Sequence, residues 1–135
     1  MGIGWRKRCG AITVGDIADC DSSGDEATAK LVDQLPGTIA TLGDNVYPIG
    51  HAKRFAECYT SSWGQFKART RPTTGNHEYE VHGAAGYFRY FGVAAGNPAP
   101  DYYSYDLSTW HIVVLNSNCD KIAGGCQAGS PQDQA

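Results

Sequence analysis

Two short β-prone runs each lead into the dipeptide Gly-Asp, and a helical segment separates them. Residues 11–15 precede Asp16, residues 38–42 precede Gly43-Asp44, and residues 25–35 between them have helical character. A strand–helix–strand unit of this kind makes its two strands parallel neighbours. In open α/β sheets, ligands bind beyond the carboxyl ends of the strands. We therefore expect an α/β fold in which Asp16 and Asp44 lie on the same rim of a sheet.

Further along the chain, helical and extended segments continue to alternate. In the first helix, Ala27, Leu31 and Leu35 recur at every fourth position along one face. The tail after Cys119 is rich in Gly and Gln and is expected to carry no core. The remaining expected elements are a helix over 51–67, an extended piece over 71–74, a helical turn over 87–91, and a β-hairpin over 102–116 that turns at Ser108-Thr109.

Length and composition limit the classes of protein that need to be considered. The chain has 135 residues, the usual size of one domain, with 41% hydrophobic and 19% charged residues, as in ordinary globular proteins. No apolar run approaches the roughly 20 residues that a membrane-spanning helix needs. A net charge of −3 gives no reason to expect nucleic-acid or membrane partners. The basic N-terminal stretch has no apolar run behind it and is not expected to act as a signal peptide.

Three glycine-initiated segments carry the candidate chemistry. They are Gly15-Asp16-Ile17-Ala18, Gly43-Asp44-Asn45-Val46-Tyr47 and Gly75-Asn76-His77-Glu78, and each follows an extended segment. Their carboxylate, phenol and amide oxygens suit hard or borderline cations. A single Gly-Asp after a strand is more often a turn or a helix cap. Three such segments in this order favour a metal centre.

The ordered set resembles the calcineurin-like metallophosphoesterase superfamily, and the Tyr in Gly-Asp-x-x-Tyr resembles its purple acid phosphatase branch. The resemblance runs from Ile12 to Gln132 and includes Tyr-Phe-x-Tyr-Phe-Gly at 87–92, Tyr-Tyr-Ser-Tyr-Asp at 102–106 and Leu-Asn-Ser at 115–117. It implies the N-terminal part of a four-layer α/β/β/α metallophosphoesterase sandwich. Residues 1–10 would form an N-terminal segment, and residues 11–135 a partial domain that lacks its C-terminal half and exposes a broad apolar flank.

The resemblance also implies a role for each candidate residue. Two metal ions, iron paired with zinc, manganese or a second iron, would activate water and clamp a phosphoryl group. The substrate would be a phosphorylated small molecule or protein. In the implied assignment, Asp16 binds the first metal, Asp44 bridges both, Tyr47 binds the first as a phenolate, Asn76 binds the second, His77 acts on the leaving oxygen, and Glu78 orients His77 or its loop.

Two departures from the family pattern qualify this interpretation. Many relatives have a metal-binding His where this chain has Ala18, and Tyr47 can fill the vacant place. The later His and Gly-His-x-His segments of the family have no match: His51 and His82 lie too early, and His111 is expected to be a packed or edge residue. The leading hypothesis is therefore a phosphomonoesterase whose activity is largely lost in this chain. The alternatives are a non-catalytic fragment or interaction module, and a phosphodiesterase.

The cysteines and two arginines leave alternatives open. Five cysteines contain no C-x-x-C pair, which argues against a structural zinc site. Cys119 and Cys126 could form a local disulfide, which would indicate an exported parent protein, or stay as two free thiols. Arg69 and Arg71 precede the Gly75 segment and could steer phosphate or form a solvated pair.

Overall fold

The computed structural model describes residues 10–134, which form a small mixed α/β domain. Its centre is a three-stranded parallel sheet in the order β1-β3-β5, formed by β1 (Ala11–Val14), β3 (Thr38–Thr41) and β5 (Thr70–Arg71). Ile12 pairs with Ile39, and Ile39 pairs with Thr70. The predicted parallel arrangement of the strands before Asp16 and Asp44, which are β1 and β3, is thereby confirmed. The expected segment 1–10 lies outside the described residues apart from Gly10.

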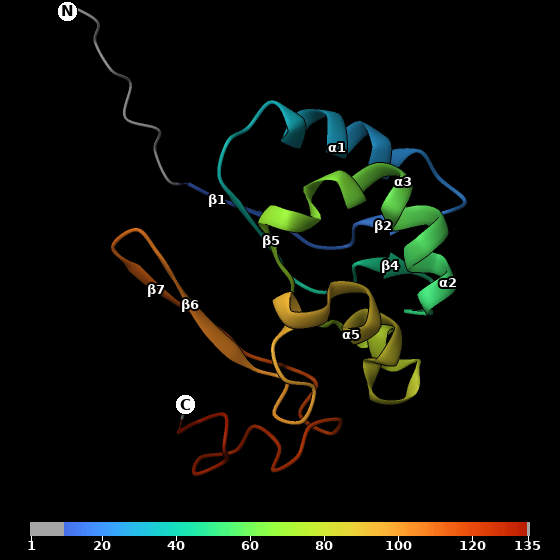
Figure 1. The fold of residues 1–135 in the computed structure, drawn as a ribbon. Coiled ribbons are helices and arrows are strands. Elements are labelled where there is room, and N and C mark those ends of the chain that lie inside the picture. The colour runs from blue at the N-terminus through green and yellow to red at the C-terminus, as the bar shows by residue number, and fades with distance from the viewer. Residues whose placement is uncertain (1–9, 135) are drawn as a thin grey trace, which may run out of the picture.

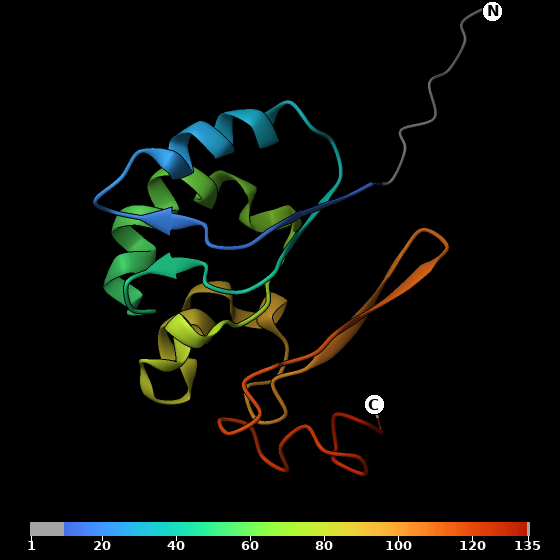
Figure 2. The same cartoon turned by 180° about the vertical axis from the view of Figure 1, so that it is seen from behind.

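A second parallel pair continues beyond the first sheet. It consists of β2 (Ala18–Asp19) and β4 (Val46–Tyr47), with Ala18 paired to Val46. Each Gly-Asp segment therefore lies between two strands, because β1 leads through Asp16 into β2 and β3 leads through Asp44 into β4. Figures 1 and 2 show the β1–β2 segment and the β3–β4 segment running side by side.

Helices cover the strands. The helical stretches at 24–33, 52–69 and 85–91 lie close to the expected segments, whereas those at 76–79, 82–84 and 92–95 were not expected. Figure 1 shows α1 and α3 on one side of the strands and α5 on the other. The predicted helix over 51–67 is a continuous run made of α2, a π-helical turn η1, α3 and a 3-10 segment η2. The helical bounds are α1 Gly24–Asp33, α2 Ala52–Arg54, η1 Phe55–Tyr59, α3 Thr60–Ser62, η2 Trp63–Arg69, α4 Asn76–Tyr79, η3 His82–Ala84, α5 Ala85–Phe91 and η4 Gly92–Ala95.

The core lies where the strands meet the helices. Aromatic rings dominate it: Phe55, Tyr59 and Trp63 are fully buried on the η1–η2 run, and Phe91 of α5 packs edge-on against the first two. Edge-to-face packing of this kind adds to the stabilisation from area burial. The core therefore joins the helical run to α5, around the strands that carry the Gly-Asp segments.

The buried face of α1 differs from the apolar stripe in the sequence. Leu31 is 65% exposed and Leu35 is 48% exposed, whereas Ala29 and Val32 are buried together with Asp25. Asp25 fixes this rotation, since its carboxylate accepts a 2.6 Å hydrogen bond from Ser62 and its carbonyl accepts one from the Trp63 indole. The stripe of every fourth residue thus faces away from the core.

The C-terminal part is a hairpin followed by an irregular tail. Strands β6 (Tyr103–Leu107) and β7 (Trp110–Val114) pair antiparallel, with Leu107 opposite Trp110, as predicted. The hairpin projects from the helical body in both views (Figures 1 and 2). Apolar side chains are exposed on α1 and on the hairpin, where Trp110 is 71% exposed. No helix within residues 10–134 is long and apolar enough to cross a membrane.

Candidate functional site

The aspartates of the two Gly-Asp turns share one unusual backbone conformation. Asp16 and Asp44 both lie in the left-handed region, with φ of 54° and 49°. Non-glycine residues seldom adopt this region, and aspartate is among the few that tolerate it. The turns are also joined to each other, because the Asp16 amide donates to the Gly43 carbonyl at 3.3 Å and the Ile17 amide to the Asp44 carbonyl at 3.0 Å. Both aspartates are therefore presented at one rim of the domain.

The phenol of Tyr47 joins the two aspartates. Its hydroxyl donates to Asp16 Oδ1 in a short hydrogen bond and lies 3.2 Å from Asp44 Oδ2. Burial, followed by the hydrogen bond to Asp16 and the charge of Asp44, raises the pKa of Tyr47 above its ordinary value. Three acidic oxygens thus meet at one point, and a cation there would oppose the mutual repulsion of their ionised forms.

The third segment approaches this cluster through its backbone. The His77 amide donates to Asp44 Oδ1 at 3.0 Å. A Cβ atom at Gly75 would lie 2.1 Å from Asp44 Oδ1 and 2.3 Å from the Asp44 nitrogen, so only glycine fits there. Asn76 lies between these two contacts as the first residue of α4, and its side chain is exposed. The structure therefore brings Asp16, Asp44 and Tyr47 into direct contact and places Asn76 in the segment packed on Asp44.

Glu78 binds the two loops together. Its side chain is fully buried and accepts three backbone hydrogen bonds, from Asp44 at 3.1 Å, Asn45 at 2.8 Å and Gly75 at 2.7 Å. Burial raises the pKa of Glu78, while the amides of Gly75 and Asn45 act in the opposite direction. Of the two orienting roles expected for Glu78, its contacts fit the one that orients the loop.

The ring of His77 is fixed by a backbone carbonyl. Its Nδ1 lies 2.6 Å from the Pro48 oxygen, and its ring lies against Tyr47 with centroids 4.3 Å apart. Because a carbonyl oxygen can only accept, Nδ1 carries the proton. The other ring nitrogen, Nε2, is therefore the unprotonated one in the neutral ring.

Within residues 10–134, the other expected candidates take no part in the contacts among Asp16, Asp44 and Tyr47. Arg69 is not part of a solvated pair, because its guanidinium donates to the carbonyls of Val32, Leu35 and Gly37 at the end of α1. The guanidinium of Arg71 lies 5.6 Å from the centre of the Tyr105 ring. His51 is exposed at the extended N-cap position before α2, and His82 is exposed in η3. His111 is an exposed residue of β7 whose ring nitrogen lies 2.7 Å from Asp106.

The candidate site is an open rim. A groove of about 810 Å³ between η2 and the hairpin is lined by Lys67, Arg71, Phe91 and Tyr103, among others, and by none of the six expected site residues. Within residues 10–134, no three His, Cys, Asp or Glu side chains form a metal-type cluster. The cluster at the rim instead combines two carboxylates with a phenol, and a third protein oxygen type, the Asn76 amide, lies in the adjoining segment.

The cysteines form two disulfides in the described part of the chain. Cys119 and Cys126 are joined, which agrees with the first of the two alternatives left open by the sequence. Cys20 and Cys58 form a second bridge, which links the segment after β2 to η1 and was not foreseen. The fifth cysteine, Cys9, lies outside the described residues.

Sequence reasoning also missed a buried polar network behind the third segment. It is centred on Asp101, and its partners are Thr74, Tyr79 and Asn116. These residues are far apart in the sequence and follow no periodic pattern. The only local feature that could have indicated this network is the position of Asp101 in a loop rich in Gly and Pro.

Comparison of the chain with family models, with curated proteins and with solved structures finds no match. The functional conclusion therefore depends on the geometry of the rim and on the sequence pattern.

Proposed function

We propose that this chain carries part of a metal-dependent phosphoesterase centre, with Asp16, Asp44, Tyr47 and Asn76 as metal ligands. The observation that supports it is the convergence of two carboxylates and a phenol from separate turns on one point. Hydrogen bonding alone gives a weak reason to gather three acidic groups on an open rim. A cation gives a stronger one, because hard cations favour oxygen ligands.

The donor set fits a first cation better than a second. Asp16, Asp44 and Tyr47 would hold the first, with Tyr47 as a phenolate. Asp44 has a second oxygen near the Asn76 segment, so Asp44 and Asn76 would hold the other metal. When bound, such ions supply Lewis acidity for a phosphoryl oxygen and lower the pKa of water. Iron with zinc, manganese or a second iron is the pair that the family resemblance favours.

The remaining roles belong to His77 and Glu78. With Nδ1 held by the Pro48 carbonyl, His77 would present Nε2 to a phosphate ester and, in its imidazolium form, pass a proton to the departing oxygen. Glu78 would keep the Asp44 and Gly75 loops at a fixed separation through its three amide contacts. Rigid support of this kind matters because small displacements of catalytic groups are costly to the rate.

The preferred reaction is hydrolysis of phosphomonoesters carried by a small molecule or protein. A strongly basic groove, as expected for nucleic-acid diesters, finds no support in a chain with a net charge of −3. We further propose that the parallel sheet and its helices are one half of a four-layer α/β/β/α sandwich. The exposed apolar side chains on α1 and the hairpin are consistent with further layers.

Metal binding by the intact chain tests this proposal. Ferric iron bound by Tyr47 should give a phenolate charge-transfer band in visible light, and Tyr47→Phe should abolish it. Tyr105→Phe is the matched control, since the Tyr105 hydroxyl lies on the hairpin and has no hydrogen-bond partner within residues 10–134. A wild-type chain that binds neither ferric iron nor zinc, or a band that survives in Tyr47→Phe, would contradict the assignment.

Turnover assays separate the enzyme from its alternatives. Hydrolysis of p-nitrophenyl phosphate above that of bis(p-nitrophenyl) phosphate would support a monoesterase, and the reverse order a diesterase. Binding of two metals without turnover of either ester would favour the non-catalytic module. Where either ester is hydrolysed, His77→Ala is the companion variant, since loss of the imidazole should lower turnover while leaving metal binding in place.

A further inference from the structure

The buried carboxylate of Asp101 is hydrogen-bonded to the residues on both sides of the segment that carries Asn76, His77 and Glu78. Asp101 Oδ2 accepts a hydrogen bond from Thr74 Oγ1 at 3.0 Å, directly before this segment. The same oxygen accepts a short hydrogen bond from the hydroxyl of Tyr79, directly after it. Thr74 and Tyr79 therefore share one acceptor across the four residues between them.

Asp101 is an unusual residue to bury for packing alone. Its side chain is only 6% exposed, its backbone has a φ of 47°, and no Lys or Arg within residues 10–134 forms a salt bridge with it. Burial raises the pKa of its carboxyl, which the three neighbouring donors partly counteract. Burying a charge without a cation costs free energy unless hydrogen bonds compensate for it. The site thus combines a costly group with a strained backbone.

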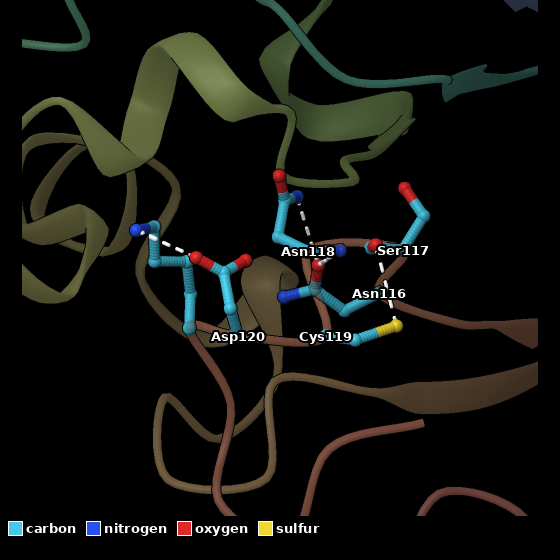
Figure 3. Close-up of polar contacts among 6 residues, drawn as sticks. Asn116, Ser117, Asn118, Cys119 and Asp120 are labelled. Atoms are coloured by element: carbon cyan, nitrogen blue, oxygen red, sulfur yellow. Dashed lines mark hydrogen bonds and ion pairs between the residues drawn. The ribbon is translucent and has the colours of Figure 1, made fainter. Parts of the chain in front are cut away.

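A third donor, Asn116, binds the same oxygen of Asp101. The amide nitrogen of Asn116 donates to Asp101 Oδ2 at 2.6 Å and to the Tyr79 hydroxyl at 2.8 Å. Asn116 is itself fixed, since its side-chain oxygen accepts from the backbone and side chain of Asn118, as Figure 3 shows in part. Its backbone pairs with the Gln132 side chain in both directions, at 2.7 and 3.0 Å. The orientation of the Asn116 amide is therefore determined on every side.

We infer that Asp101, oriented by Asn116, is a positioning residue that sets the distance between the Asn76–Glu78 segment and the Asp44 carboxylate. The expected effect on metal binding rests on the proposed function, whereas the effect on the position of the segment does not. The amides of Gly75 and His77 are the atoms through which this segment contacts Glu78 and Asp44. Releasing Thr74 and Tyr79 from Asp101 frees the segment at both ends, so these two amides lose their fixed partners.

The test compares two buried aspartates in the full chain. Asp101→Ala should shift the amide proton resonances of Gly75 and His77 and speed their hydrogen exchange. Asp25→Ala is the matched control, because Asp25 is 3% exposed and hydrogen-bonded to Ser62 but lies on α1. It should lower stability and leave both resonances in place. If Asp101→Ala lost as much stability as Asp25→Ala but left the Gly75 and His77 amide resonances unmoved, Asp101 would have only a structural role. That result would overturn the inference.

Two further measurements keep the result unambiguous. If Asp101→Ala does not fold, Tyr79→Phe removes a single donor and should move the same two amides, and failure to do so would overturn the inference. Zinc affinity, measured by calorimetry with the metal alone, should weaken about 10–100-fold in Asp101→Ala, as for other supporting residues of metal sites. Shifted amides in Asp101→Ala, together with a wild-type chain that binds neither zinc nor ferric iron, would uphold the positioning role and refute the proposed function instead.

Discussion

Replacing Gly75 with alanine tests the close packing of the two loops directly. The backbone of Gly75 is extended, with φ −114° and ψ −174°, so alanine meets no conformational penalty there. Its Cβ, however, would lie 2.3 Å from the Asp44 nitrogen, whereas ordinary contact begins at 3.4 Å. The Asp44 loop would have to retreat by the difference, about 1.1 Å, and the amide hydrogen bond from Asp44 to Glu78 would be broken.

The expected loss of stability follows from these displacements. Overpacking costs about 1–3 kcal/mol, and losing the hydrogen bond costs about 1 kcal/mol more. The Gly→Ala change returns roughly 0.5 kcal/mol by restricting the unfolded chain. We therefore expect Gly75→Ala to lower the free energy of unfolding by about 2–3 kcal/mol and Tm by about 10 °C. The shift of the carboxylate should also weaken metal binding.

Two other glycines serve as controls in urea and thermal unfolding. Gly10 has open space around its would-be Cβ, so Gly10→Ala should be close to neutral. Gly83 also has open space but a φ of 61°, so Gly83→Ala should lose only the strain of about 1–2 kcal/mol. If Gly75→Ala were as stable as Gly10→Ala and bound metal equally well, the loops would not be packed as described, and the steric reasoning would be refuted.

Three further predictions concern the support of the site. Arg69→Lys should destabilise the chain by roughly 2 kcal/mol in urea unfolding, because an ammonium cannot reach all three carbonyls at the end of α1; an unchanged midpoint would contradict this. Since burial raises the pKa of Asp101, its contribution to stability is full below the ordinary carboxyl pKa of about 4 and is lost as pH rises through the folded-state value. Asp101→Asn does not titrate, so its stability relative to the wild type should increase as the pH rises above about 4. A flat difference would argue against a buried carboxylate. Removing the Cys20–Cys58 bridge, which spans 38 residues, should lower the free energy of unfolding by about 4 kcal/mol. Removing the Cys119–Cys126 bridge, which spans 7 residues, should lower it by about 2.5 kcal/mol, and the reverse order of the two losses would contradict this prediction.

Local signals were sufficient to predict most elements of the fold. The β-branched runs before Asp16 and Asp44 form parallel strands, and the helix between them begins and ends within a few residues of the expected bounds. The face that α1 buries could not be predicted in the same way. Four-residue spacing selects a stripe by hydrophobicity, whereas the hydrogen bonds of Asp25 to a distant helical segment determine the rotation of the helix.

The candidate site was predictable to the extent that it follows from strand ends. Because Asp16 and Asp44 leave neighbouring parallel strands, their meeting at one rim follows from topology, and Tyr47 comes with Asp44. The Asp101 network could not be found, since its members come from separate loops and meet only through tertiary packing. Nothing in their spacing indicates that they share one acceptor.

The left-handed backbone at Asp16 and Asp44 affects how substitutions at these positions should be interpreted. An acidic residue there satisfies two demands, the sharp reversal of the chain and the negative charge at the rim, and replacement by alanine removes both. Asparagine tolerates the same reversal but carries no charge. Exchange of both residues for asparagine would keep the turn conformation and remove only the two negative charges. A loss of cation affinity in this double variant could therefore be assigned to charge, whereas a loss in the alanine variants could not.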